Sequence, residues 1–138
     1  MPKIIKNNQK AVKNNLGEKN SSTKSPIKKR LEKQRLENFT RGWIVGDFDP
    51  AILKSKDFEV MVRFYKKGEV DPGHLHKVAD EITVVVSGKH MMNGEIIEPG
   101  DIIHFTPGTV MEYFECLEDG ALVAIKRPSV KGDKYLLE

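Results

Sequence analysis

The sequence has almost no cysteine and no long apolar run. Cys116 is the only cysteine among 138 residues, so it cannot form a disulfide within the chain. We interpret it as a small buried hydrophobic residue, and the lack of disulfides favours the reducing cytoplasm. No apolar stretch approaches the roughly 18 residues needed to cross a bilayer, and the lysine- and asparagine-rich start is not a secretory signal. We therefore expect a cytoplasmic protein without a membrane span.

Basic and acidic residues are unevenly distributed. Residues 1–37 carry 11 Lys or Arg and 3 Glu, whereas the rest of the chain carries 12 basic and 17 acidic residues. The first 25 residues contain too little apolar surface to offset the entropy of ordering, which predicts disorder. A serine followed by proline at position 26 and good helix formers after it predict a short helix at 26–38. We expect a basic tail over 1–38 and a folded domain over 39–138.

The basic tail raises the question of nucleic acid. Positive charge alone supports weak, non-specific attachment to phosphates. No aromatic residue interleaves the lysines of residues 1–37, and no recognition motif is present there. We therefore do not expect nucleic acid as a partner, except weakly through this tail.

From residue 39 onward the pattern is typical of short β-strands. Residues 58–65 alternate, and Phe58, Val60, Val62 and Phe64 fall on one face. Asn93-Gly94 is a strong hairpin signal between strands at 90–92 and 95–97. The other expected strands span 42–48, 82–86, 101–105, 110–117 and 121–126. Many short strands separated by turn residues predict an all-β sandwich or barrel.

Two histidines and a glutamate form the most distinctive motif. His74 and His76 are two positions apart, so in an extended strand their side chains point the same way. Glu81 precedes a β-branched run, which predicts a strand that holds its carboxylate rigidly. Two imidazoles and one carboxylate from neighbouring strands suit a divalent transition metal. The alternative is that the histidines cap a turn and Glu81 is solvated.

The spacing around this motif resembles the first motif of the cupin family. That motif reads G-x5-H-x-H-x4-E-x6-G. In this chain its fixed positions are Gly68, His74, His76, Glu81 and Gly88. Asp80 is a competing carboxylate, but only Glu81 keeps the six-residue step to the last glycine. The resemblance implies a double-stranded β-helix, or jelly-roll, cupin barrel that follows the basic tail.

A second stretch resembles the second cupin motif less closely. Gly100 and Gly108 match it, but Thr106 stands where the family has proline and Glu115 where it has asparagine. Met111 stands in place of the histidine that usually supplies the fourth metal ligand. Together the two motifs extend the resemblance over residues 40–128.

The resemblance implies a metal site in a pocket. His74, His76 and Glu81 are the expected ligands of iron, manganese, nickel or zinc, with open positions left for water and substrate. Met111, Tyr113 and His104 are the expected pocket residues. Two further residues, Glu112 and His90, are weaker candidates, and on strand alternation Glu112 points away from the site. No catalytic residue is assigned.

Two functions remain open. The first is a metal-dependent enzyme on a small sugar-like or carboxylate substrate, either an oxygenase or an isomerase or epimerase, as the family implies. The second is a non-catalytic ligand-binding or regulatory cupin whose metal site has weakened or been lost, as the altered second motif suggests. In either case the resemblance implies a homodimer formed through barrel edges.

Overall fold

The structure is a computed structural model that describes residues 28–138. The predicted disorder of residues 1–25 and the start of the predicted helix lie outside this range. Residues 28–35 contain no helix, and only the 3₁₀ turns η2, Leu36–Asn38, and η3, Thr40–Gly42, precede the first strand. Leu31 is one of the few apolar side chains that such a helix would offer for packing, and it is exposed. This corrects the helix prediction, since a short unpacked helix is marginal.

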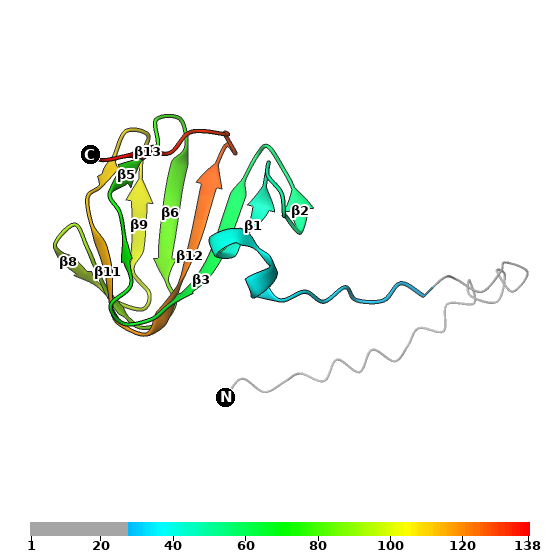
Figure 1. Ribbon diagram of the computed structural model, residues 1–138, viewed down its shortest axis with the longest axis horizontal. Helices are drawn as coiled ribbons and strands as arrows, with labels where there is room; N and C mark the ends of the chain where they lie inside the picture. The colour runs from blue at the N-terminus through cyan, green and yellow to red at the C-terminus, as the bar shows by residue number, and fades with distance from the viewer. Residues whose placement is uncertain (1–27) are drawn as a thin grey trace, which may run out of the picture. The chain divides into compact units, whose positions relative to one another are not determined.

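A six-stranded sheet forms one wall of the barrel (Figure 1). Its order is β2-β1-β3-β12-β6-β9, and these strands span Leu53–Lys54, Trp43–Gly46, Glu59–Tyr65, Gly120–Arg127, Asp80–Val85 and Ile102–Phe105. The long central strand β12 pairs antiparallel with both β3 and β6. This shared register places side chains from the three strands in rows across the inner face.

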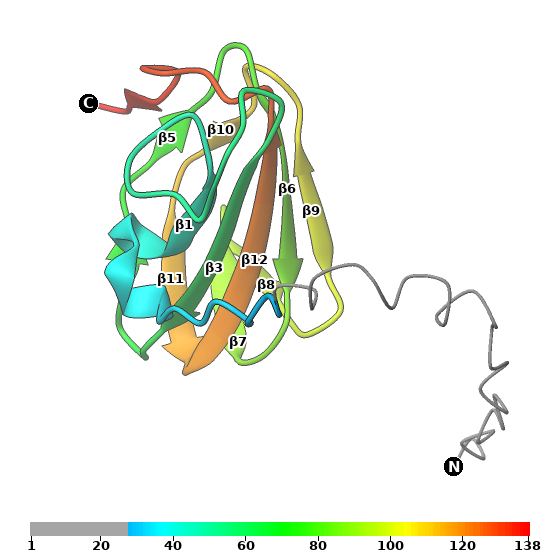
Figure 2. The ribbon, with the colours of Figure 1, turned by 90° about the vertical axis from the view of Figure 1, so that its right-hand side faces the viewer.

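Two smaller sheets form the remaining wall (Figure 2). One has the order β10-β5-β13, with strands Val110–Met111, His74–Leu75 and Tyr135–Leu136. The other has the order β4-β11-β7-β8, with strands Val70–Asp71, Phe114–Glu118, Lys89–Met92 and Glu95–Ile97. The predicted hairpin is confirmed, because Asn93 and Gly94 join β7 to β8 with φ of 51° and 78°.

The hydrophobic core lies between the large sheet and the two small ones. It draws residues from all three sheets: Met61, Tyr65, Val85, Met92, Ile97, Phe105, Met111, Phe114, Cys116, Leu122 and Ala124. Cys116 is buried and unpaired, as expected for a small core residue. The all-β, double-stranded β-helix prediction is confirmed. No helix in the described residues is long and apolar enough to cross a membrane.

Strand β3 turns its more apolar face outward. Phe64 is 69% exposed, whereas Met61 and Tyr65 belong to the core. The inward-facing side chains of β3 include Glu59 and Arg63, which line a cavity. The apolar stripe recognised in the sequence is therefore the outer surface of the barrel, and the mixed polar face is the inner one.

Candidate metal centre

The structure brings the three predicted ligands together at one wall of the barrel. His74 lies on β5, His76 follows in the next loop, and Glu81 is the second residue of β6. One potential ligand atom from each lies within 4.8 Å of the other two. The two imidazole rings meet edge to face with centroids 5.1 Å apart. Among residues 28–138, this is the one group of three or more such side chains with metal-binding spacing.

Backbone carbonyls orient both imidazoles. The Nδ1 of His74 lies 3.2 Å from the carbonyl oxygen of Pro72, and the Nδ1 of His76 lies 2.6 Å from that of Asp133. A carbonyl can only accept a hydrogen bond, so in each neutral ring Nδ1 carries the proton. The Nε2 lone pairs are thereby left free. Such carbonyl partners are typical of metal-binding histidines, and the N, N, O donor set fits a divalent transition metal.

Asp133 also holds the loop between His76 and Glu81. Its carboxylate accepts hydrogen bonds from the backbone N–H groups of Lys77, Val78 and Ala79, at 2.9 to 3.2 Å. Burial alone would raise the pKa of Asp133, but these three N–H donors outweigh it and lower that pKa. The C-terminal strand β13 then pairs with β5, with Leu136 opposite His74. The C-terminal segment therefore braces the loop and strand that carry the ligands.

The surroundings of the ligands favour uncharged imidazoles. Burial, with added repulsion from Lys134, His76 and Lys126, lowers the pKa of His74 to about 4. Burial likewise lowers the pKa of His76 and raises that of Glu81. Neutral imidazole is the form that binds metals. At neutral pH, both histidines therefore present the required state without having to lose a proton.

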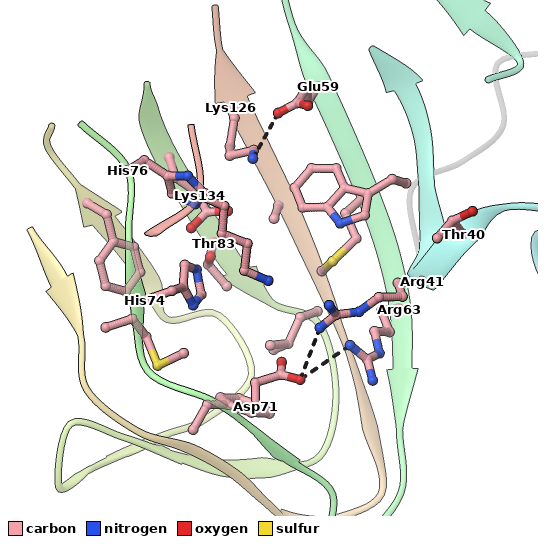
Figure 3. Close-up of a pocket in the computed structure, with 18 of the residues that line it drawn as sticks. Thr40, Arg41, Glu59, Arg63, Asp71, His74, His76, Thr83, Lys126 and Lys134 are labelled. Carbon is pink, nitrogen blue, oxygen red and sulfur yellow. Dashed lines mark hydrogen bonds and ion pairs between the residues drawn. The ribbon is translucent and has the colours of Figure 1, made fainter. Parts of the chain in front are cut away.

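The ligands open into a cavity of about 310 Å³ (Figure 3). Apolar side chains, among them Phe105, Met111 and Leu122, form much of its wall. Charged side chains of both signs also line it: Arg41, Arg63, Lys126, Lys134, Asp49, Glu59, Asp71 and Glu81. This combination of apolar walls and a few polar groups is typical of small-molecule sites.

A row of alternating charge crosses the inner face of the large sheet. Lys126 on β12 pairs in register with Glu59 on β3 and with Glu81 on β6. The ammonium of Lys126 lies 2.8 Å from the Glu59 carboxylate, and both side chains are only 12% exposed. The same ammonium lies 4.7 Å from the centroid of the Trp43 ring. Lys126 therefore has Glu59 as its ion-pair partner and also lies next to a predicted metal ligand.

A second charged cluster surrounds Asp71. Its carboxylate lies 3.4 Å from a guanidinium nitrogen of Arg63 and 3.5 Å from one of Arg41. The hydroxyl of Tyr65 donates to it at 2.7 Å. Burial, the charge of Asp71 and this hydrogen bond all raise the pKa of Tyr65, so the phenol keeps its proton. Two arginines and a tyrosine thus share one carboxylate on the cavity wall.

Met111 lies where the family resemblance expects a fourth ligand. It is 6% exposed, lines the cavity and pairs with His74 across β10 and β5. Glu112 is exposed, and its backbone N–H donates to the side chain of Asn93 at 2.6 Å. It is not among the cavity-lining residues, in agreement with the alternation expected from the sequence.

Two predicted pocket residues lie elsewhere. His104 alternates with the inward-facing Ile103 and Phe105, so its exposed imidazole points outward, and its Nε2 lies 3.0 Å from Asp80. Tyr113 follows the end of β10 and is not among the cavity-lining residues. Of the three residues expected in the pocket, Met111 lines the cavity, whereas His104 and Tyr113 do not. The face on which a side chain lies depends on the strand register, which the sequence alone does not fix.

His90, the weaker candidate, is a core residue. It is fully buried, and its ring stacks on Phe114 at a centroid distance of 5.5 Å. Its Nε2 bonds to the carbonyl oxygen of Ser87, and it does not line the cavity.

Sequence reasoning missed Lys126, Asp133 and Lys134. A lysine inside the apolar run at 121–126 was an available signal for the first, because a charge on a central strand needs a partner. The other two lie in a polar C-terminal stretch that carries no motif.

Comparisons with known proteins support the fold. No protein-family model matches the sequence, and no match was found among curated proteins. An uncharacterized conserved Klebsiella pneumoniae protein with a double-stranded β-helix domain is 25% identical. Its TM-score is 0.53, with 61% of this chain and 77% of that one covered.

Two enzymes are structurally similar at lower identity. A DMSP lyase from Ruegeria pomeroyi is 18% identical with a TM-score of 0.56, covering 68% of this chain and 49% of the lyase. An oxalate decarboxylase from Bacillus subtilis is 17% identical with a TM-score of 0.50, covering 60% of this chain and 24% of the decarboxylase. The chain thus spans about half of the lyase and a quarter of the decarboxylase. At these identities the two enzymes support the fold alone.

Proposed function

Because the chain has the cupin fold, we propose that it is a metal-dependent enzyme acting on a small molecule in the barrel cavity. The observation that carries this proposal is the convergence of His74, His76 and Glu81 within 4.8 Å at the cavity wall. The cavity volume, about 310 Å³, lies in the range of small-molecule sites. A metal held by these side chains at the cavity wall could also contact a substrate inside the cavity.

The chain's own residues define the chemistry that the site can support. His74 and His76 would supply nitrogen donors and Glu81 an oxygen donor, a set that suits iron, manganese, nickel or zinc. When bound, such an ion supplies a Lewis acid or a redox centre. Lys126 lies beside Glu81 and Glu59, so it offsets negative charge that would otherwise accumulate in the row.

The substrate would be a small sugar-like or carboxylate compound, and the reaction an oxygenation or an isomerisation or epimerisation. An isomerase needs a side-chain base near the substrate. In the described cavity, Glu59 is paired with Lys126, Asp71 with two arginines, and Asp49 with Lys54. Tyr65 keeps its proton because its pKa is raised. Because few side chains of the described cavity could act as a free base, we favour an oxygenase over an isomerase or epimerase.

Activity measurements with defined metals test this function. The chelator-treated full chain would be loaded separately with Fe²⁺, Mn²⁺, Ni²⁺ and Zn²⁺. Oxygen uptake and isomer formation are then measured with a panel of small hydroxy acids, keto acids and sugars. We expect turnover that requires both the metal and His74, with the exposed His104→Ala variant as the active control. Metal binding without turnover on any of these compounds would contradict the enzyme proposal.

A non-catalytic binding or regulatory cupin is the second candidate. Met111 favours it, because this thioether replaces the expected fourth ligand and is a poor donor for iron(II), manganese or zinc. Under this alternative, a metal or small ligand stabilises the fold without being consumed. Ligand-dependent melting without product formation would identify this case.

We propose further that the protein is a cytoplasmic homodimer and that nucleic acid could attach only weakly, through the basic tail. The outer face of β3, β12, β6 and β9 exposes a group of large apolar side chains: Phe64, Ile82, Ile102 and Ile125. Contiguous exposed apolar residues mark association surfaces, so a second copy of the chain is the proposed occupant. Light scattering should give the dimer mass, and Phe64→Lys should lower it. A monomeric wild type would contradict the proposal.

A further inference from the structure

The charged side chains that line the cavity balance one another only while no metal is bound. Its four cations are Arg41, Arg63, Lys126 and Lys134, and its four carboxylates are Asp49, Glu59, Asp71 and Glu81. A divalent ion on the ligands would add two further positive charges. Like charges gathered in one partly enclosed space are unfavourable unless an anion joins them. With a metal bound, the net positive charge of the cavity therefore favours an anionic ligand.

Three of the four cations already have carboxylate partners. Lys126 pairs with Glu59 at 2.8 Å, and Arg63 and Arg41 both approach Asp71, at 3.4 and 3.5 Å. Arg63 also approaches Glu69 at 3.8 Å. These groups mainly neutralise one another and shape the wall. Their pairing leaves little charge free for a ligand.

Lys134 differs from them. It lines the cavity, yet no salt bridge to it occurs among residues 28–138. Its side chain is exposed, and Figure 3 shows its ammonium end pointing toward the centre of the cavity. Burial and the nearby Arg41 lower the pKa of Lys134, as expected for an ammonium drawn toward other cations. The carboxylates of Asp71 and Glu81 offset part of this repulsion, although neither forms a salt bridge with the Lys134 ammonium.

The C-terminal segment holds Lys134 in this position from both sides. The preceding residue, Asp133, is anchored by its bonds to the backbone N–H groups of 77–79, and the following residue, Tyr135, pairs with Leu75 on β5. Lys134 therefore extends from a braced backbone rather than from a free terminus. This preorganisation lowers the entropy cost of using the side chain to bind a ligand.

We propose that Lys134 binds the carboxylate of a small organic acid in the cavity that the His74–His76–Glu81 group opens into. This inference rests on the proposed function and narrows its substrate to a carboxylate. A lone ammonium is a point charge that suits a carboxylate monoanion. Phosphate is typically held by bidentate arginines or by a helix N-terminus. Here both arginines are engaged by Asp71, and the only helical segment on the wall of the described cavity is the three-residue 3₁₀ turn η3, which is too short to form an anion site.

Calorimetric titration of the full chain with malonate tests the proposal. The neutral analogue malonamide and inorganic phosphate serve as comparison ligands, and metal-free and Mn²⁺-loaded protein are both titrated. Malonate should bind, more weakly as salt rises, and Lys134→Gln should reduce its affinity by about tenfold or more. Lys134→Arg should retain most of the affinity. Lys131→Gln is the matched control, because Lys131 is an exposed lysine of the same segment whose nearest carboxylate is Asp47, at 3.9 Å.

Equal malonate affinity in wild type and Lys134→Gln would overturn the inference, as would malonamide binding as tightly as malonate. Tighter binding of phosphate than of malonate would overturn the carboxylate assignment. Metal content measured on the same samples separates the two proposals. If malonate binding depends on Lys134 but the chain takes up no metal, the proposed metal-dependent enzyme is contradicted and the Lys134 inference is not. If the chain takes up metal but malonate binding does not depend on Lys134, the Lys134 inference is contradicted and the metal-dependent enzyme is not.

Discussion

The Nδ1 of His76 donates a 2.6 Å hydrogen bond to the backbone carbonyl of Asp133, 57 positions further along the chain. The same residue accepts hydrogen bonds from the loop that follows His76, through its carboxylate. Asp133 thus holds both a predicted ligand and the segment leading to Glu81. The metal centre is therefore not confined to the strands that carry its donors, because it also depends on the C-terminal segment.

Asp133→Asn should weaken both the fold and the metal site. The amide has one acceptor oxygen in place of two and no charge, so some of the N–H groups at 77–79 lose their partner. We expect a loss of about 2 kcal/mol in the free energy of unfolding of the metal-free chain, measured by urea denaturation. Metal affinity should fall by about tenfold or more, as for other groups that support a ligand. The exposed Asp57→Asn is the control, and equal behaviour of the two variants would contradict the bracing role.

Met111→His should add a fourth nitrogen donor. Met111 is buried, lines the cavity and lies opposite His74 in the β10–β5 pair, so an imidazole there would face the same space. We expect metal affinity to rise by about tenfold or more, measured by competition with a chelator. Glu112→Ala should change it little, because that side chain is exposed outside the cavity. A Met111→His variant that binds metal no better than wild type would contradict this placement.

The metal-free chain should lose stability as the pH falls from about 6.5 to about 4. The folded-state pKa of His74 is lowered from 6.5 to about 4, so the unfolded chain binds this proton more readily across that window. Glu81 contributes with the opposite sign because its pKa is raised. Unfolding free energies are therefore compared in a Glu81→Gln background, with and without His74→Gln. An unchanged pH slope after His74→Gln would contradict the lowered pKa.

Removal of residues 1–33 should leave a folded domain. Residues Gln34–Glu138 form a compact unit, and residues 28–35 are exposed and without secondary structure. We expect the same melting temperature and metal content as in the full chain. Removal of residues 1–42 should destabilise the domain, because Phe39 is buried and Arg41 contacts Asp71. Insoluble protein after the shorter deletion would show that the tail belongs to the core.

The parts of the molecule that depend on local chemistry were predictable from the sequence. Two histidines at strand spacing must share a face, and the β-branched run after Glu81 forms the strand expected of it. Asn93-Gly94 makes its hairpin because both residues accept positive φ. These features require no knowledge of distant contacts.

The orientation of faces was harder to predict. On β3 the stripe that includes Phe64 is the more apolar one, yet the opposite stripe, with Glu59 and Arg63, faces inward. A barrel that encloses a polar cavity reverses the usual rule that the apolar face is the inner one. Likewise, His104 was an expected pocket residue, although its alternation with Phe105 on β9 turns it outward.

The contribution of the C-terminal segment could not be predicted. Asp133 and Lys134 lie in a short polar stretch with no periodicity or motif. Asp133 bonds to the loop after β5, more than 50 positions away, and the residues that follow Lys134 pair with β5 itself. Only the tertiary structure brings these residues to the site.

Elemental analysis of the full chain purified without chelators tests the metal centre most directly. We predict close to one equivalent of a transition metal in wild type and in His104→Ala, whose imidazole lies on the outer face. His74→Ala, His76→Ala and Glu81→Ala should each lose most of it, since removing one of the three donors leaves two. Stoichiometric metal in a His74→Ala, His76→Ala double variant, or none in wild type even after incubation with Fe²⁺, Mn²⁺, Ni²⁺ or Zn²⁺, would contradict the assignment.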